Sequence, residues 1–112
     1  MSDFMEINIE ENMPLASDAL KILRSFIPLY KEQKIHCILV IHGYGSTGKG
    51  GVICRKARKW LKSEETAGHV KNVIFGEDFD VLNSEARKLK NRYHELDQLM
   101  YSYNPGVTVV EL

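Results

Sequence analysis

The chain has 112 residues and no net charge, because fifteen acidic residues balance fifteen basic ones. This length fits one domain with a real core and is too short for two, and the balance means that any positive patch for a nucleic acid must be local. No apolar run approaches the length of a membrane span and two cysteines are too few for a disulfide framework, so we expect a reduced, cytoplasmic protein without membrane association.

Hydrophobic periodicity predicts four strands that alternate with three helices. Residues 4–10 alternate between apolar and polar, as a half-exposed strand does, whereas residues 35–41 are apolar on both faces apart from His36, as in a central strand. The resulting β-α-β-α-β-α-β order predicts a single layered α/β domain over residues 1–112. In chain order, the predicted elements are a strand at 4–10, a helix at 15–30, a strand at 35–41, a helix at 53–61, a strand at 70–75, a helical segment at 82–100 and a strand at 107–112.

A glycine-rich segment follows the predicted central strand and precedes the second helix. A strand, a glycine loop and a helix in this order direct backbone N–H groups, a helix dipole and a cation at one spot, which favours a phosphate. Five glycines exceed the need of a tight turn and cost conformational entropy on ordering, which favours close approach to a ligand. The residues predicted to form this phosphate site are His42, Gly43, Tyr44, Gly45, Gly48, Lys49, Gly50 and Gly51.

The helix after the loop carries a local excess of positive charge. Six cations lie between Lys49 and Lys62, with no acid among them. On a helix, Arg55, Arg58, Lys59 and Lys62 share one face, opposite the apolar stripe. We predict that this face follows a nucleic-acid backbone through salt-sensitive contacts that do not read bases; a merely solvated basic face is the alternative.

Residues 43–49 also match G-x-x-x-x-G-K, the start of a nucleotide-binding P-loop. A P-loop continues with Ser or Thr, whose hydroxyl binds magnesium, whereas this chain has Gly50. No later apolar strand ends in an Asp suited to magnesium, and the nearest approach is the segment 75–78. A P-loop-like nucleotide binder is therefore a lesser alternative.

Three segments together resemble the small MutS-related (Smr) domain family: Ile38-Leu39-Val40-Ile41-His42-Gly43-Tyr44-Gly45, Gly50-Gly51 and Gly106-Val107-Thr108-Val109-Val110-Glu111-Leu112. The resemblance implies an α/β sandwich with a four-stranded mixed sheet packed by helices. It also implies binding of DNA or RNA, and endonuclease activity in some members. Family members are linked to DNA repair or recombination, or to RNA and ribosome quality control.

The family's first motif, Leu-Asp-x-His-Gly at the end of strand one, is altered here. By register the chain has Ile7-Asn8-Ile9-Glu10-Glu11. Asn8 cannot act as a base, and Glu10 places a carboxylate where the family has an imidazole. Whether the chain is an enzyme therefore stays open, and an endonuclease that uses His42 with Glu10 is the alternative to binding alone.

Other roles at this loop are also open. We favour a binding or loop-shaping role for His42 over catalysis, and Tyr44 either stacks on an unpaired base or folds back over the loop. We expect no cofactor and no metal site, with a divalent metal needed only by a nuclease. A protein partner on the third helix is a further alternative, and the oligomeric state is open.

Overall fold

The computed structural model describes residues 3–11, 15–44 and 49–112 of the chain. Strands and helices alternate along it in the predicted β-α-β-α-β-α-β order, which is confirmed. Three short 3-10 helices are added among the later elements. The elements are β1 Phe4–Asn8, α1 Ala16–Glu32, β2 Cys37–Ile41, α2 Lys49–Thr66, β3 Asn72–Phe75, η1 Gly76–Asp78, α3 Ser84–Arg92, η2 His94–Leu96, η3 Leu99–Tyr101 and β4 Val107–Glu111.

The four strands form one mixed sheet in the order β1-β2-β4-β3. Strand β2 runs parallel to β1, with Phe4 opposite Cys37 and Asn8 opposite Ile41, and antiparallel to β4. Strand β3 pairs with the other side of β4, also antiparallel. The predicted central position of β2 is confirmed, since a strand that is apolar on both faces needs a neighbour on each side and a layer above and below.

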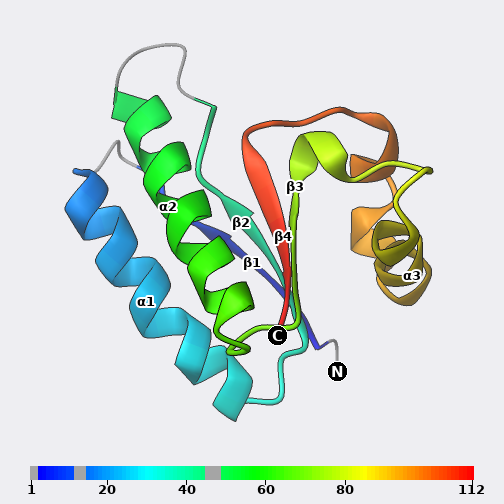
Figure 1. The fold of residues 1–112 in the computed structure, drawn as a ribbon, viewed down its shortest axis with the longest axis horizontal. Helices are drawn as coiled ribbons and strands as arrows, with labels where there is room; N and C mark the ends of the chain where they lie inside the picture. Colours follow the sequence, from blue (N-terminus) through cyan, green and yellow to red (C-terminus); the bar gives the residue numbers. More distant parts are fainter. Residues whose placement is uncertain (1–2, 12–14, 45–48) are drawn as a thin grey trace.

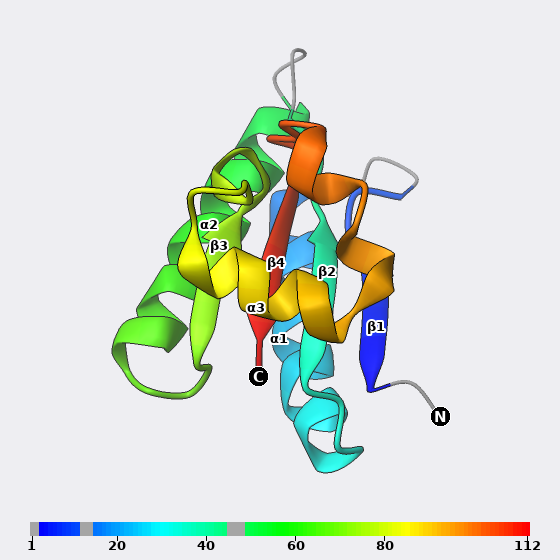
Figure 2. The same cartoon turned by 90° about the vertical axis from the view of Figure 1, so that its right-hand side faces the viewer.

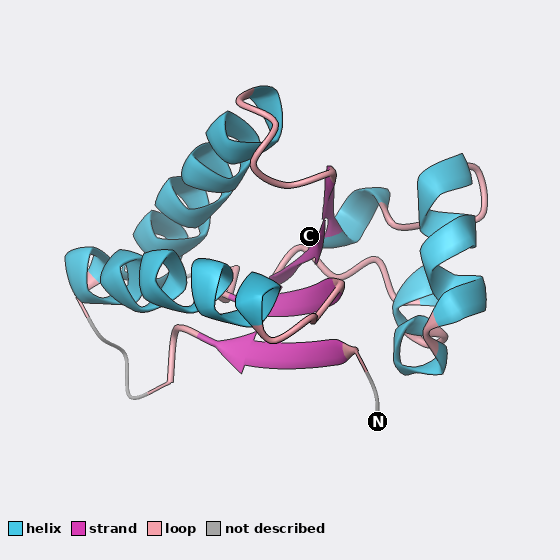
Figure 3. Cartoon of the chain, turned by 90° about the horizontal axis from the view of Figure 1, so that it is seen from below, coloured by secondary structure: helices cyan, strands magenta, loops and turns pink. Residues whose placement is uncertain are grey.

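Helices cover both faces of the sheet and so produce three layers (Figures 1 and 3). Helices α1 and α2 lie side by side on one face, while α3 and the 3-10 helices that follow it lie on the other (Figure 2). Ile38, Val40 and Val110 belong to the core beneath α1 and α2, whereas Cys37 and Val109 belong to the core beneath α3. Neighbouring residues of a strand point to opposite faces, so β2 and β4 contribute to both cores. The predicted layered sandwich is confirmed.

Strand β1 ends at Asn8, two residues earlier than predicted. The chain nevertheless continues alongside β2, because the N–H of Ile9 donates to the carbonyl oxygen of Ile41 over 2.9 Å. Ile9 is buried in the core on the α1 side. Glu10 is thereby brought to the end of β2, where the glycine loop begins.

The predicted helical segment at 82–100 is wrong in extent. Helix α3 stops at Arg92, because Tyr93 adopts an extended conformation with φ −129° and ψ 103°. The Tyr93 hydroxyl donates to Asp3 over 2.9 Å, and its ring packs on Phe4 with centroids 5.6 Å apart. No Gly or Pro marks this helix end in the sequence, so the hydrophobic periodicity predicted a helix that was too long. The helix ends instead where Tyr93 contacts the start of the chain.

Close packing of the turn before β4 predicts a cost for any side chain at Gly76. A Cβ on Gly76 would collide with the carbonyl oxygen of Asn104 and would approach Val107 Cγ2 to 2.8 Å. Since a backbone atom must move to relieve this overlap, we expect Gly76→Ala to lower the free energy of unfolding by about 1–3 kcal/mol. Urea denaturation measures the change, and an unaltered midpoint would contradict the packing described.

Candidate functional site

One edge of the sheet collects the segments that the sequence singled out. Strands β1 and β2 are parallel and β4 is antiparallel to β2 and β3, so three strand C-termini meet the N-terminus of β4 at this edge. The edge is at the top of Figure 2, where the turn before β4 lies beside the chain that leaves β2. The segments that meet there are 9–11, 42–44, 76–78 and 103–106.

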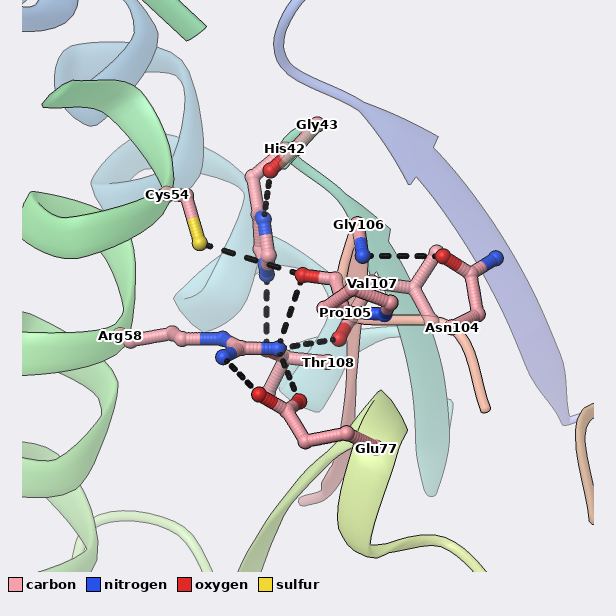
Figure 4. Close-up of polar contacts among 10 residues, drawn as sticks. All are labelled: His42, Gly43, Cys54, Arg58, Glu77, Asn104, Pro105, Gly106, Val107 and Thr108. Carbon is pink, nitrogen blue, oxygen red and sulfur yellow. Dashed lines mark hydrogen bonds and ion pairs between the residues drawn. The ribbon is translucent and has the colours of Figure 1, made fainter. Parts of the chain in front are cut away.

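The His42 side chain links the segment 42–44 to β4 and is fully buried (Figure 4). Its Nδ1 lies 2.9 Å from the carbonyl oxygen of Gly43. A carbonyl oxygen only accepts, so Nδ1 carries the proton and Nε2 must be an acceptor. The Thr108 hydroxyl lies 2.8 Å from Nε2 and therefore donates to it. Both ring nitrogens are used inside the protein, one for the loop and one for β4.

Burial also keeps the His42 ring uncharged. Removal from water lowers the pKa of His42 from its ordinary 6.5 to about 4, and the nearby charge of Arg58 acts in the same direction, while the hydrogen bond to Gly43 opposes it. The ring is consequently neutral at neutral pH. This arrangement shapes the loop and offers no exposed ring nitrogen for the proton transfer that the catalytic alternative requires.

Arg58 reaches from α2 into the same network (Figure 4). Its guanidinium pairs with Glu77 through two hydrogen bonds, Nη1 to Oε2 at 2.8 Å and Nη2 to Oε1 at 2.6 Å. Nη2 also donates to the carbonyl oxygens of Pro105 and Val107, and Nε donates to Thr108 Oγ1 at 3.2 Å. The Arg58 side chain is only 13% exposed, so it does not lie on the exposed basic face where the sequence placed it.

The first amides of the glycine loop are already paired. The N–H groups of His42 and Gly43 both donate to the carbonyl oxygen of Gly106, at 3.1 and 3.0 Å. Gly43 has φ +73°, a left-handed conformation that favours glycine, and the Glu10 carboxylate occupies the space that a Cβ would need. These two amides therefore hold the turn before β4, with a carboxylate beside them.

The remaining loop residues are placed only in part. Gly45 and Gly48 lie outside the described residues, as does the side chain of Lys49, so the predicted contacts of these residues with phosphate stay predictions. The backbones of Lys49, Gly50 and Gly51 form the first turn of α2. Tyr44 is 66% exposed, which leaves its ring accessible to a ligand.

The outer face of α2 is basic and accessible. Arg55, Lys56 and Lys59 are exposed, and none of them pairs with an acid within the part of the chain that the structure describes. Lys62 is also exposed, but its Nζ is shared between Glu65 Oε1 and the carbonyl oxygen of Val73, at 3.2 Å each. Of the four cations predicted for this face, Arg55 and Lys59 are thus exposed and unpaired, and Lys56 is a third that the sequence analysis did not select.

Sequence reasoning missed Thr108 and Glu77. Thr108 is fully buried, and three of its four companions in β4 are valines. A buried hydroxyl needs a hydrogen-bond partner, so its place among apolar residues was a usable signal. In the sequence, Glu77 is notable only as part of the segment 75–78, the nearest approach to a strand that ends in a magnesium-binding Asp. Its pairing with Arg58 joins residues 19 apart and lowers the pKa of the Glu77 carboxyl, and no local pattern reveals such a contact.

Other kinds of site are not evident in the described parts of the chain. No described helix combines the length and apolarity that a bilayer crossing requires. Within residues 3–11, 15–44 and 49–112, no three His, Cys, Asp or Glu side chains gather as metal ligands would. Cys37 and Cys54 are buried free thiols.

His42 should make stability depend on pH below neutrality. Its pKa is about 4 in the folded state against 6.5 ordinarily, so the unfolded state binds more protons between these values. The contribution of His42 is therefore complete above about pH 6.5 and is lost as the pH falls towards 4, by about 3 kcal/mol. Carboxylates such as Glu77 also lose their charge in acid, so the assignment requires NMR of the ring nitrogens. We expect a neutral ring with the proton on Nδ1 at about pH 5.5, and a charged ring at that pH would contradict the network.

Comparison with known proteins places this architecture in a family. The model of the Smr domain matches residues 15–78, from the residue before α1 to the end of η1, and this segment contains the glycine loop and the basic helix. Strand β1, α3 and β4 lie outside the match. No curated protein and no solved structure matches the chain significantly. Smr domains bind nucleic acids, and some of them are nucleases. Since the match covers more than half of its length, the chain belongs to the Smr domain family.

Proposed function

We propose that this Smr domain binds nucleic acid through the phosphate backbone, using the outer face of α2 and the exposed ring of Tyr44 in the loop before that helix. The observation that carries the proposal is the set Arg55, Lys56 and Lys59, which are exposed and have no acidic partner among the described residues. In a chain without net charge, such a face concentrates positive potential on one surface. The nucleic-acid binding known for Smr domains supports the proposal.

The start of α2 extends this surface towards the loop. Lys49, Gly50 and Gly51 form its first turn, and a helix N-terminus presents free N–H groups and a partial positive charge to an anion. Arg58 is left out of the surface, because its donors are used by Glu77 and by the turn before β4. Arg58 and His42 instead hold the helix and the loop in fixed relation.

Phosphate contacts position a protein without reading bases, so the surface suits DNA and RNA alike. We extend the proposal to a role in DNA repair or recombination, or in RNA and ribosome quality control, as the family implies. We also propose a cytoplasmic location, which is supported by the free thiols of Cys37 and Cys54, since a reducing compartment preserves such thiols.

Salt dependence tests the proposed surface. We expect the double variant Arg55→Ala/Lys59→Ala to bind duplex DNA more weakly and to lower the slope of log K against log salt by about 1.8, because two phosphate contacts are lost. Filter binding over a salt series measures both quantities. Lys88→Ala is the matched control, since it removes an exposed cation from α3 on the opposite face of the sheet. Equal effects of the double variant and the control on the slope would contradict the proposal.

A variant of Glu10 distinguishes a domain that only binds nucleic acid from one that also cleaves it. Its carboxylate lies against Gly43, where it would repel an incoming phosphate. For a domain that only binds, we expect Glu10→Gln to raise the affinity by about two- to fivefold at low salt, because one repulsive charge disappears. Incubation with plasmid and structured RNA in the presence of manganese tests the endonuclease alternative. Cleavage by the native chain that Glu10→Gln abolishes would make Glu10 a catalytic carboxylate and would overturn a purely binding role.

A further inference from the structure

A groove of about 370 Å³ lies between α1 and α2, which are neighbours on the same face of the sheet (Figure 1). On α2, the lining positions recur at intervals of three and four residues, so they share one face of that helix. The two lining positions of α1 are likewise four residues apart. The lining residues are Leu20, Arg24, Lys56, Lys59, Trp60 and Ser63.

The groove has a charged rim. Arg24, Lys56 and Lys59 are exposed, and the lining contains no acidic residue. The cations that line the groove come from two helices, Arg24 from α1 and Lys56 and Lys59 from α2. The solvated basic face considered in the sequence analysis belongs to a single helix. Such convergence suits an anion small enough to enter between the helices.

The groove also has an apolar floor. Leu20 is buried and Trp60 is half-buried against the core beneath α1 and α2. The guanidinium carbon of Arg24 lies 5.8 Å from the centre of the indole ring, so an anion that binds Arg24 arrives next to Trp60. A ligand that fits both features carries a phosphate and a flat apolar group.

We propose that this groove holds one nucleotide of an unpaired strand, with its phosphate at Arg24, Lys56 and Lys59 and its base against Trp60. The proposal rests on the nucleic-acid function above and deepens it by naming the form of the nucleic acid. A base inside a duplex is stacked and paired and cannot turn into a recess, whereas the bases of a single strand are free to stack on aromatic side chains. Duplex DNA therefore contacts only the cations of α2 and does not enter the groove.

Trp60 provides a direct readout, because it is the only tryptophan of the chain. We expect a single-stranded oligonucleotide to change its fluorescence in a saturable manner that weakens with salt, and a duplex of the same sequence to leave the emission unchanged while it binds. Oligonucleotides with and without a terminal phosphate show whether the bound group is an internal diester or a strand end. Emission that is unchanged by a strand shown to be bound in filter binding would overturn the proposal.

Arg24→Ala isolates the groove, because Arg24 lies on α1 and outside the proposed duplex surface. We expect this variant to bind the single strand about fivefold or more weakly, with a salt slope lower by about 0.7, and to bind the duplex with unchanged affinity. Lys21→Ala is the matched control, an exposed cation of the same helix that does not line the groove. The same effect from both variants would overturn the assignment.

Three further outcomes are decisive. A nucleoside monophosphate that binds Trp60 as tightly as the strand would make the groove a site for free nucleotides and would overturn the strand assignment. A poly-glutamate peptide that produces the same fluorescence change would replace the nucleotide by an acidic protein segment. In the third outcome, duplex binding depends on Arg55 and Lys59, but Arg24→Ala does not weaken binding of the single strand. This result would refute the groove and leave the proposed function intact.

Discussion

The partly buried ion pair between Arg58 and Glu77 is the interaction on which the candidate site at this edge of the sheet depends. It brings α2 to the end of β3, and the remaining donors of the guanidinium satisfy the turn before β4 and the Thr108 hydroxyl. Thr108 in turn donates to His42, and His42 donates to the loop at Gly43. One chain of hydrogen bonds therefore runs from the helix to the loop, and loss of either charge would leave the other partly buried without its partner.

This network divides the cations of α2 into two groups. Arg58 points inward and is structural, whereas Arg55, Lys56 and Lys59 point outward and remain free of acids among the described residues. Helical geometry makes the division possible, because adjacent residues differ by about 100° in direction. The neutral, buried His42 belongs to the structural group, since it fixes the loop through hydrogen bonds and carries no charge at neutral pH. The inward-facing contacts of Arg58 therefore fix the position of α2, and this position exposes the outer face of the helix.

The order of elements, the central strand and the basic helix could be predicted, because they depend on local periodicity and on the sequence of the loop. The direction of Arg58 could not, because its partner Glu77 is distant in the sequence and helical spacing placed the side chain on the wrong side of α2. The end of α3 was missed for a similar reason, since the contacts of Tyr93 are made with Asp3 and Phe4. The groove combines Arg24 from one helix with Trp60 from another, a juxtaposition that only the packing of α1 on α2 reveals.

The central claim is that nucleic acid lies along the outer face of α2 beside the loop. Mapping of backbone amide NMR shifts on the isotope-labelled chain during addition of nucleic acid tests it most directly. The largest changes are expected at Tyr44 and in the exposed positions of α2 from Arg55 to Ser63, with α3 unaffected. Changes that concentrate on α3, or that spare α2, would contradict the account.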